Sequence, residues 1–361
     1  MEEKGKKGRM DYTLLLIVVL LVVIGLVILY STSAYNGQVK FHDSFYYLKK
    51  QAFATVLGIV LMLFVAGMDY HIWQRLAVFG YLAAVALSVA VMLFGREING
   101  SKRWLALGPF SFQPSEFAKV ALILFLADLV TKNVKTIGKM WTLCRIMFWI
   151  LPIVGLVGAS NLSTAIIILG IGVILIFVAS PKYAQFALMG IAGACFMGLF
   201  LALESYRLER LAIWRNPEKY EKGYQTLQGL YAIGSGGVFG VGIGNSVQKL
   251  GFVPEAQNDM IFSIICEELG LAGAGIIVFL FLLLIWRFFL IASGSRDLFG
   301  ALIATGAMAH MMIQVILNIA VVTNTIPNTG ITLPFISYGG TSVMFLLIEM
   351  GLVLSVSQVV D

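Results

Sequence analysis

Residues 253–270 read VPEAQNDMIFSIICEELG, and the character of the chain changes within this stretch. Up to Asp259 the chain is polar, and from residue 260 an apolar run continues to about residue 290. Because that run exceeds the ~20 residues that cross a bilayer, we expect a membrane-spanning helix here. Carboxylates at a membrane boundary are costly to keep ionised and usually have a function or a partner. The stretch therefore predicts a membrane protein with a functional acid, Asp259, at the end of a span.

The composition extends this interpretation to the whole chain of 361 residues. Hydrophobic residues make up 59% and charged residues 12%, whereas soluble domains have ~45–50% apolar and about 25% charged residues. A soluble globular protein is therefore excluded. The net charge of +6 is compatible with anionic lipid headgroups or an anionic substrate, and nothing in the sequence indicates a nucleic-acid partner.

Apolar runs of about the length of a bilayer crossing predict an all-α polytopic membrane protein with ten transmembrane helices. We interpret residues 1–361 as a single membrane domain with one large extracellular loop, about 205–258, between the seventh and eighth spans. The predicted spans are 12–31, 52–68, 75–95, 114–131, 143–159, 162–180, 184–204, 260–290, 298–322 and 341–359.

The distribution of basic residues predicts the orientation of the chain. Four of them precede the first span: Lys4, Lys6, Lys7 and Arg9. Because cytoplasmic segments are enriched in Lys and Arg, the N-terminus is expected in the cytoplasm, and ten spans return the C-terminus there. The two sides then carry equal numbers of Lys and Arg, and only without segment 205–258 does the cytoplasmic side have twice as many. External cations thus exceed what topology requires, and an anionic ligand on that face is the simplest reason.

Two segments outside the 253–270 stretch contain candidate ligand contacts. In segment 96–119, Glu116 and Lys119 are three residues apart and share one helix face. Two interpretations stay open: a local ion pair, or a site in which Arg103 adds a guanidinium suited to a diphosphate. In the external loop, Arg207, Arg210 and Arg215 are expected at headgroup level on a short amphipathic helix. The glycine run 234–244 has no Walker pattern and no strand context, so nucleotide binding is not expected; close approach of its backbone to a ligand or to neighbouring helices stays open.

Asp259 itself has two interpretations, because Asp is also a good N-cap residue for the following helix. Glu267 and Glu268 lie about two turns deeper and are expected within the hydrocarbon. We expect Glu268 to pair with Lys119, with Arg103 or with a polar residue of another span.

The last external turn, residues 323–342, reads TNTIPNTGITLPFISYGGTS. Its prolines and glycines prevent a helix, so its irregular backbone must line a cavity or be buried in protein. Ser337 and Tyr338 would offer hydroxyl groups there. On the preceding span a polar stripe with a period of four predicts hydrogen bonds between helices. It consists of His310, Gln314 and Asn318.

Three segments together resemble the SEDS family of bacterial cell-wall proteins (shape, elongation, division and sporulation), which includes FtsW and RodA. They are NGSKRWLALGPFSFQPSEFAK at 99–119, GYQTLQGLYAIGSGGVFGVGIGNSVQKLGFVPEAQNDMIFSIICEELG at 223–270 and IPNTGITLPFISYGGTS at 326–342. The resemblance spans nearly the whole chain. The segment GNSVQKLGFVPEAQND is more similar to the division and sporulation branch than to the elongation branch.

The resemblance implies an enzyme of the bacterial cytoplasmic membrane that polymerises lipid II into glycan strands on its outer face. The implied partners are lipid II, the lipid-linked glycan strand and a class B penicillin-binding protein. Asp259 matches the family's essential aspartate, and Arg103 matches its basic residue before tryptophan. The family motif QPSE-x-x-K corresponds to Gln113, Pro114, Ser115, Glu116 and Lys119.

Two positions depart from the family pattern. Gln257 stands where the family often has histidine, so proton shuttling by that side chain is not expected. Segment 160–164 reads SNLST where the family often has P-D-x-G-T, so a charged role is not available there.

The implied reaction fits these residues. The 4-hydroxyl of an acceptor sugar displaces a lipid diphosphate with inversion, which requires a base and cations for the leaving group. Asp259 would be the base, and Arg103, Lys119, Arg210 or Lys249 the cations. The other predicted substrate-binding residues are Gln113, Ser115, Glu116, Glu255, Gln257, Glu268, Ser337 and Tyr338. A divalent cation, Mg²⁺ or Mn²⁺, could share the diphosphate, although the sequence shows no ligand set for it.

Two other functions compete with this one. A lipid II flippase would also use charges within the membrane and broken helices, and a scaffold that recruits a transpeptidase would need no external charges. The sequence shows no inverted repeat, and its acids and cations cluster on the predicted outer face. These features favour the polymerase.

Overall fold

The computed structural model describes residues 8–98, 101–107, 110–187, 190 and 212–359. This part of the chain is mostly helical, and eight of its helices are long and apolar enough to cross a membrane. The long helices are α1 (Tyr12–Phe41), α2 (Tyr46–Gly67), α3 (His71–Phe94), α4 (Pro114–Asn133), α5 (Met140–Ser160), α6 (Leu162–Ala179), α10 (Ile261–Gly294), α11 (Leu298–Val322) and α12 (Gly340–Ser357). The shorter ones are α9 (Tyr224–Ser235) and the 3-10 turns η1 (Pro217–Lys219) and η2 (Glu221–Gly223).

The predicted spans agree with the described helices to within about four residues, apart from four places. Helix α2 begins at Tyr46, earlier than its predicted start at residue 52. Helix α1 continues ten residues past its predicted end at residue 31. Helix α4 is not among the eight apolar helices, because it carries Glu116, Lys119, Asp128 and Lys132. It is nevertheless largely buried and packs against α3, α5, α6, α11 and α12. The predicted span 184–204 lies mostly outside the described residues.

The chain is not purely helical, because a small antiparallel sheet lies between α3 and α4. Its strands are β1 (Arg96–Ile98), β2 (Ser101–Leu107) and β3 (Phe110–Phe112), in the order β1-β2-β3. The register pairs Glu97 with Lys102 and Leu105 with Phe112. The turn-forming pairs Asn99-Gly100 and Gly108-Pro109 separate the strands in the sequence, as is typical of short hairpins.

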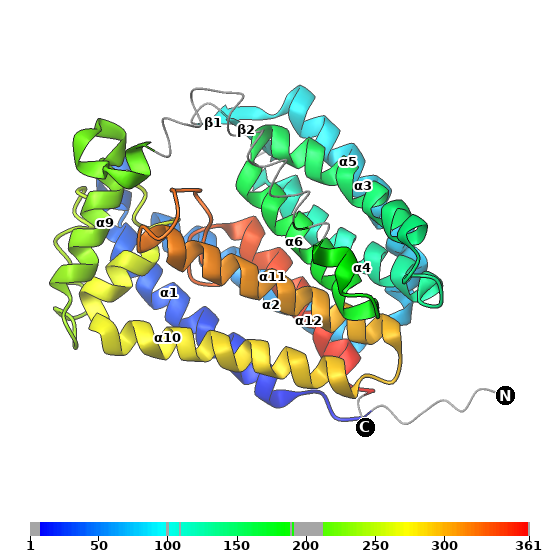
Figure 1. Ribbon diagram of the computed structural model, residues 1–361. Coiled ribbons are helices and arrows are strands. Elements are labelled where there is room, and N and C mark those ends of the chain that lie inside the picture. Colours follow the sequence, from blue (N-terminus) through cyan, green and yellow to red (C-terminus); the bar gives the residue numbers. More distant parts are fainter. Residues whose placement is uncertain (1–7, 99–100, 108–109, 188–189, 191–211, 360–361) are drawn as a thin grey trace.

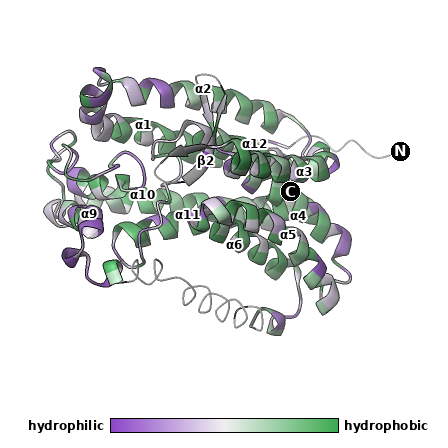
Figure 2. Ribbon diagram, turned by 90° about the horizontal axis from the view of Figure 1, so that it is seen from above, coloured by the Kyte–Doolittle hydropathy of each residue, from purple (hydrophilic) through white to green (hydrophobic). Residues whose placement is uncertain are grey.

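The helices form one elongated bundle, with both termini at the same end (Figure 1). There the backbone N–H of Asp11, before α1, donates to Ser357 Oγ at the end of α12, 3.1 Å away. The opposite end contains α9 and the loop 323–339 (Figure 1). Figure 2 shows hydrophobic residues along the helices and hydrophilic residues gathered toward the two ends. This distribution is typical of a protein that crosses a bilayer.

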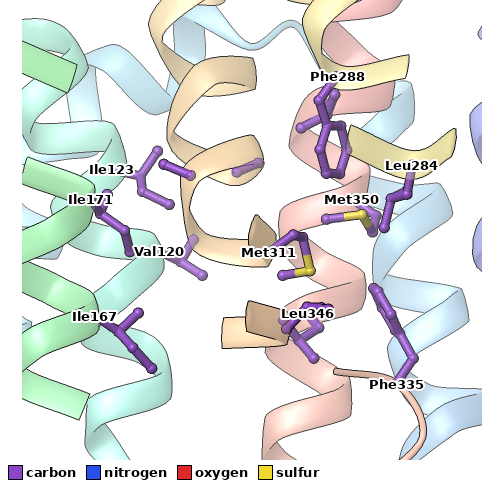
Figure 3. Packing of buried hydrophobic residues seen from close by; sticks show 14 of the residues in the cluster. Val120, Ile123, Ile167, Ile171, Leu284, Phe288, Met311, Phe335, Leu346 and Met350 are labelled. Carbon is purple, nitrogen blue, oxygen red and sulfur yellow. The ribbon is translucent and has the colours of Figure 1, made fainter. Parts of the chain in front are cut away.

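The centre of the bundle is filled by apolar side chains from several helices (Figure 3). Inside a membrane, close packing and not water exclusion holds helices together, so small residues at the contacts are favourable. Gly306 illustrates this, because a Cβ there would lie only 2.6 Å from Cγ2 of Ile123. The labelled residues in Figure 3 are Val120, Ile123, Ile167, Ile171, Leu284, Phe288, Met311, Phe335, Leu346 and Met350.

Helix α10 is broken at Gly270, whose φ of 66° and ψ of −170° are not helical. The glycine-rich segment 236–242 fills the break. The N–H groups of Val241 and Gly242 donate to the carbonyls of Glu267 and Glu268, and those of Leu271 and Ala272 donate to the carbonyls of Gly237 and Val238, each at 3.0 Å. A Cβ on Gly240 would lie 2.2 Å from the carbonyl oxygen of Glu268. The glycine run therefore lets its backbone approach a neighbouring helix, one of the two possibilities left open by the sequence, and its hydrogen bonds satisfy the backbone groups freed by the break in α10.

Candidate active site

Asp259 lies directly before α10, at the end of the bundle opposite the termini. Its interpretation as an N-cap is wrong, because Met260 occupies that position and no side chain caps the helix. The carboxyl group is half-buried. Gln225 of α9 donates to its Oδ1 from 3.4 Å, and a Cβ at Gly330 would lie 3.9 Å from its Oδ2.

The surroundings of Asp259 raise the pKa of its carboxyl group toward neutral pH. Desolvation by the surrounding protein, together with the negative charge of Glu255, raises the pKa of Asp259 from its ordinary value of 3.8 to about 7. The backbone N–H groups of Asp259 and Met260 act in the opposite direction. Within the described part of the chain, no Lys or Arg forms an ion pair with this carboxylate. A carboxyl that exchanges its proton near pH 7 has the property that a general base needs.

The segment that carries Asp259 is fastened to the loop 323–339. Nδ2 of Asn318, on α11, donates to the carbonyl of Asp259 at 2.9 Å and to that of Ile331 at 2.7 Å. Ser337 Oγ donates to the carbonyl of Asn258 at 2.7 Å. The polar stripe on α11 thus makes hydrogen bonds between elements, as predicted. Its last residue, Asn318, holds the peptide carbonyl of Asp259, the candidate base.

Three other predicted residues lie around this segment. Gln257 is buried, and its side chain accepts a hydrogen bond from Asn36 of α1 at 3.0 Å. The backbone N–H of Tyr338 donates to the carbonyl of Gln257 at 2.9 Å. The ring of Tyr338 packs edge to face against Tyr47. Glu255 is exposed and accepts from Asn258 at 2.5 Å. Gln257 and Tyr338 therefore hold the segment in place, and Glu255 is the carboxylate that faces solvent.

Glu116 and Lys119 lie on α4 inside the bundle and form an ion pair of 3.0 Å. Lys119 is only 2% exposed, and its Nζ also donates to Gln314 Oε1 at 3.2 Å. Ser342 of α12 donates to Glu116 Oε2 at 2.8 Å. The ammonium group of Lys119 is thus fully engaged with protein and does not reach a surface.

Arg103, Gln113 and Ser115 come together around a cavity of about 20 Å³ between α3, α4 and α5. Nε of Arg103 donates to the carbonyl of Ser160 at 2.9 Å, where α5 ends. Just beyond, Ser163 Oγ donates to the carbonyl of Thr329 at 2.8 Å, next to Gly330. A continuous path of contacts therefore leads from Arg103 through the α5–α6 junction to the loop beside Asp259. Arg207 and Arg210 lie outside the described residues.

Lys249 and Glu268 form a second buried ion pair, 2.6 Å long, and Ser31 of α1 bonds to both. The predicted partners Lys119 and Arg103 are therefore wrong for Glu268, whereas the expected polar residue of another span is present as Ser31. No described contact joins this cluster to Asp259. The pair borders a cavity of about 660 Å³ between α1, α2 and segment 243–250, whose lining is mostly apolar.

Sequence reasoning missed several residues around these groups. Gln225 beside Asp259 gave no signal, because a lone glutamine in a polar segment is unremarkable in type and spacing. Glu349, by contrast, is an ionisable residue within a predicted span, which is rare enough to mark it. In the structure Oε2 of Glu349 lies 2.8 Å from Nδ1 of His310. Among the described residues, no three His, Cys, Asp or Glu side chains come together as a metal site.

Eight described helices that are long and apolar enough to cross a membrane define a polytopic membrane protein. Its candidate site is at Asp259, which has no ion pair with Lys or Arg among the described residues. The sequence matches the profile of the FtsW, RodA and SpoVE family of cell cycle proteins over residues 12–361. The chain belongs to this family, and the resemblance to SEDS proteins is confirmed.

Individual relatives match along almost their whole length. The chain is 40% identical to stage V sporulation protein E of Bacillus subtilis, covering 98% of each chain. It is 35% identical to a probable peptidoglycan glycosyltransferase FtsW of Trichlorobacter lovleyi, covering 96% of this chain and 93% of the relative. A chain from a solved peptidoglycan synthase complex superposes with a TM-score of 0.82 at 30% identity, covering 96% and 97%. RodA of Thermus thermophilus superposes with a TM-score of 0.71 at 28% identity, covering 96% of both.

Proposed function

We propose that this protein is an inverting peptidoglycan glycosyltransferase that polymerises lipid II into glycan strands and releases undecaprenyl diphosphate. The names of its relatives, which include peptidoglycan glycosyltransferases and a sporulation protein, support this activity in division, sporulation or cell-shape wall synthesis. A solved relative belongs to a complex that coordinates polymerization and crosslinking. This supports a class B penicillin-binding protein as the partner, with lipid II and a lipid-linked glycan strand as substrates.

One observation carries the proposal: Asp259, with a pKa of about 7, lies at the end of the bundle opposite both termini. A basic N-terminus favours a cytoplasmic location for the termini. Asp259 then faces the exterior, where an activated sugar and its acceptor meet. The topology that accompanies this is ten spans, including α4 and the predicted span 184–204, in a single domain with an external loop of about 205–258.

In the proposed reaction Asp259 removes the proton from the 4-hydroxyl of the acceptor sugar as its oxygen bonds to the donor's anomeric carbon. The bond from that carbon to the diphosphate breaks at the same time, and the configuration inverts. Arg103 is the described cation that we assign to the departing diphosphate, because guanidinium groups form paired hydrogen bonds with phosphate oxygens. Gln113 and Ser115 line the same small cavity as Arg103, and we assign them to orienting the diphosphate.

Two buried ion pairs stabilise the protein around the site. The pair of Glu116 and Lys119 is held between α4 and α11 and fixes the helix that carries Gln314 and Asn318. Lys249, which Glu268 neutralises, and Ser31 are polar residues in the lining of the 660 Å³ cavity, whose mostly apolar lining and volume suit a polyprenyl chain. Ser337 and Tyr338 keep the loop over Asp259 in place.

A divalent cation remains a prediction. The described residues supply no dedicated set of ligands, but Mg²⁺ often binds through one or two carboxylates together with substrate phosphates. Glu255, exposed and next to Asp259, is the carboxylate that could contribute. Loss of product on chelation, restored by added Mg²⁺ or Mn²⁺, would support this role.

The test is glycan polymerisation by the purified full chain with its transpeptidase partner and labelled lipid II. We expect ladders of glycan product from the wild type and none from Asp259→Ala. Asp69→Asn, an exposed carboxylate between α2 and α3 at the other end of the bundle, is the matched control and should retain activity. Equal ladders from wild type and Asp259→Ala would refute the assignment of the base. Absence of ladders throughout, together with transfer of lipid II between leaflets of liposomes, would favour a flippase.

A further inference from the structure

A chain of buried polar groups crosses the bundle beneath the loop of Asp259. It runs from Glu116 and Lys119 on α4 through Gln314 and His310 on α11 to Glu349 on α12. All five side chains are buried. Gln314 lies one helical turn, ~6 Å along α11, from Asn318, whose side chain holds the peptide carbonyl of Asp259.

The contacts of Gln314 fix the orientation of its amide. Oε1 accepts from Lys119 Nζ at 3.2 Å and faces His310 Nε2 at 2.8 Å, while Nε2 donates to the carbonyl of Thr332 at 3.1 Å. A rotated amide would place a donor against the ammonium of Lys119 and an acceptor against the carbonyl of Thr332. Only one orientation therefore satisfies all three contacts.

This orientation determines where His310 carries its hydrogen. Because Gln314 offers an acceptor, Nε2 of His310 must be the donor. Its other nitrogen, Nδ1, then faces Glu349 Oε2 at 2.8 Å. A neutral ring with its hydrogen on Nε2 and an ionised carboxylate would leave two acceptors facing each other. A second hydrogen must lie between them, either on the ring or on the carboxyl.

We infer that His310 and Glu349 form a buried site that holds one proton, and that this proton keeps Gln314, and through it Lys119 and the Asp259 loop, in position. Glu116 and Lys119 cancel in charge, and the pair of His310 and Glu349 is neutral only with its proton. Loss of the proton would leave a negative charge inside the bundle, which is strongly disfavoured.

The ionisable groups on the helices that pack against α11 agree with a single proton shared by His310 and Glu349. Helix α4 contributes Glu116 and Lys119, α12 contributes Glu349, and α6 has no ionisable residue. On α9 the ionisable residues are Tyr224 and Tyr231, both exposed. On α10 they are Cys266, Glu267, Glu268 and Arg287, of which the charged ones bond to Ser246, Lys249 and Asp11. The remaining ionisable pair on α4, Asp128 and Lys132, bonds internally. Among these groups, Glu349 is therefore the one that faces Nδ1 of His310.

Histidine nitrogen resonances test the site without any activity. The chain has three histidines, so the full protein labelled with ¹⁵N-histidine in detergent gives few signals, and His42→Gln and His71→Gln assign the other two. We expect Nε2 of His310 to carry a hydrogen, because it faces the amide oxygen of Gln314. A neutral ring with hydrogen on Nδ1 and none on Nε2 would overturn the inference.

Two variants of one residue test the positioning role. In Glu349→Gln the amide donates to Nδ1 without ionising, so we expect polymerisation within about twofold of the wild type. In Glu349→Met no donor faces Nδ1, which is left buried without a partner, and we expect a loss of about tenfold while the single ring hydrogen stays on Nε2 opposite Gln314. Thr305→Val is the control, since that buried hydroxyl on α11 bonds only within its own helix.

Equal losses in both Glu349 variants would show that the charge and not the donor is required, and would overturn the inference. If Glu349→Met does not fold, the spectra of the wild type and Glu349→Gln still decide, because both must show the hydrogen on Nε2. The activity readout rests on the proposed function, whereas the spectra do not. Absence of glycan product from every variant with the expected spectra would therefore refute the polymerase and leave the proton site intact.

Discussion

Two carboxylates at the start of α10 have opposite surroundings. Asp259, before the first turn, is half-buried and has no ion pair among the described residues. Glu268, two turns further, is buried and bonded to Lys249 and to Ser31. The first has a pKa raised to about 7, and the second has its charge cancelled by a cation at 2.6 Å.

The difference separates a group kept for chemistry from one kept for structure. An ion pair with its hydrogen bonds satisfied is tolerated inside a protein, although a well-packed apolar pair would be as stable. An unpaired carboxylate instead destabilises the folded state, and proteins keep such groups where activity requires them. On this argument Asp259 belongs to the site, and Glu268 has a structural role as the partner of Lys249 and Ser31.

The largest effect is expected from Asp259→Asn, which should lose activity and gain stability. Removal of a general base lowers the rate by about 10²–10⁴-fold. The pKa is about 7 in the folded protein against 3.8 as the ordinary value, so the folded state binds the proton more tightly. The stability of the wild type therefore falls as pH rises from about 4 to 7 and stays low above that. The asparagine variant lacks this loss, so its melting temperature in detergent should exceed that of the wild type at pH 8 and approach it near pH 4.

The converse result would break the comparison. If Asp259→Asn melted below the wild type at pH 8, the carboxylate would be stabilising, and its role would resemble that of Glu268. Asp43→Asn is a useful control, because Asp43 is only partly buried and Lys49 holds the pKa of that carboxyl below its usual range. It should show no gain in stability at pH 8.

The second prediction concerns the buried pair. Lys249→Met leaves Glu268 without its cation, and we expect a loss of about 3–5 kcal/mol in the free energy of unfolding. Adding Glu268→Leu should recover most of that loss, because an apolar pair of similar volume replaces the ions. Thermal unfolding of the two single variants and the double variant measures the coupling. Additive losses would show that the two residues do not act as a pair.

The sequence predicted the elements well and their side-chain partners poorly. The apolar run 298–322 coincides with α11, because length and hydropathy alone define a span. Helix α1 was predicted too short, because residues 31–41 are polar. In the structure this last part of α1 reaches beyond the apolar core, where Asn36 meets Gln257. Hydropathy cannot register a helix that continues outside the hydrocarbon.

In the site, too, the sequence predicted individual residues better than their partners. Asp259 could be selected because a charged residue at a span boundary is conspicuous and matches a family motif. The pairing of Lys249 with Glu268 could not, because it depends on the glycine segment 236–242 entering the break at Gly270. Spacing along the chain indicates partners within one helix, as for Glu116 and Lys119, but not partners brought together by a fold.

A third prediction sharpens the role of Asp259 through pH. A base acts in its ionised form, and with a pKa of about 7 the ionised fraction grows roughly tenfold between pH 6 and pH 8. The initial rate of glycan polymerisation under limiting lipid II should rise by that factor and then level off. A rate that stays constant between pH 5 and pH 8 would mean that Asp259 is already ionised at pH 5. Its surroundings would then resemble those of an ordinary exposed carboxylate.

The smallest effect is expected from Gln225→Ala. The Gln225 amide donates to Asp259 Oδ1 from 3.4 Å, a long hydrogen bond that favours the ionised carboxylate. Its loss should move the midpoint of the pH–rate profile upward by less than about one pH unit, in keeping with ~0.5–1.5 kcal/mol for one hydrogen bond. The rate at pH 9 should be nearly unchanged. Gln185→Ala, whose amide bonds to the carbonyl of Gly138 away from the site, should leave the midpoint where it is. A downward shift in Gln225→Ala would mean that the glutamine stabilises the protonated acid, so that Asp259 would serve as a donor in the resting site.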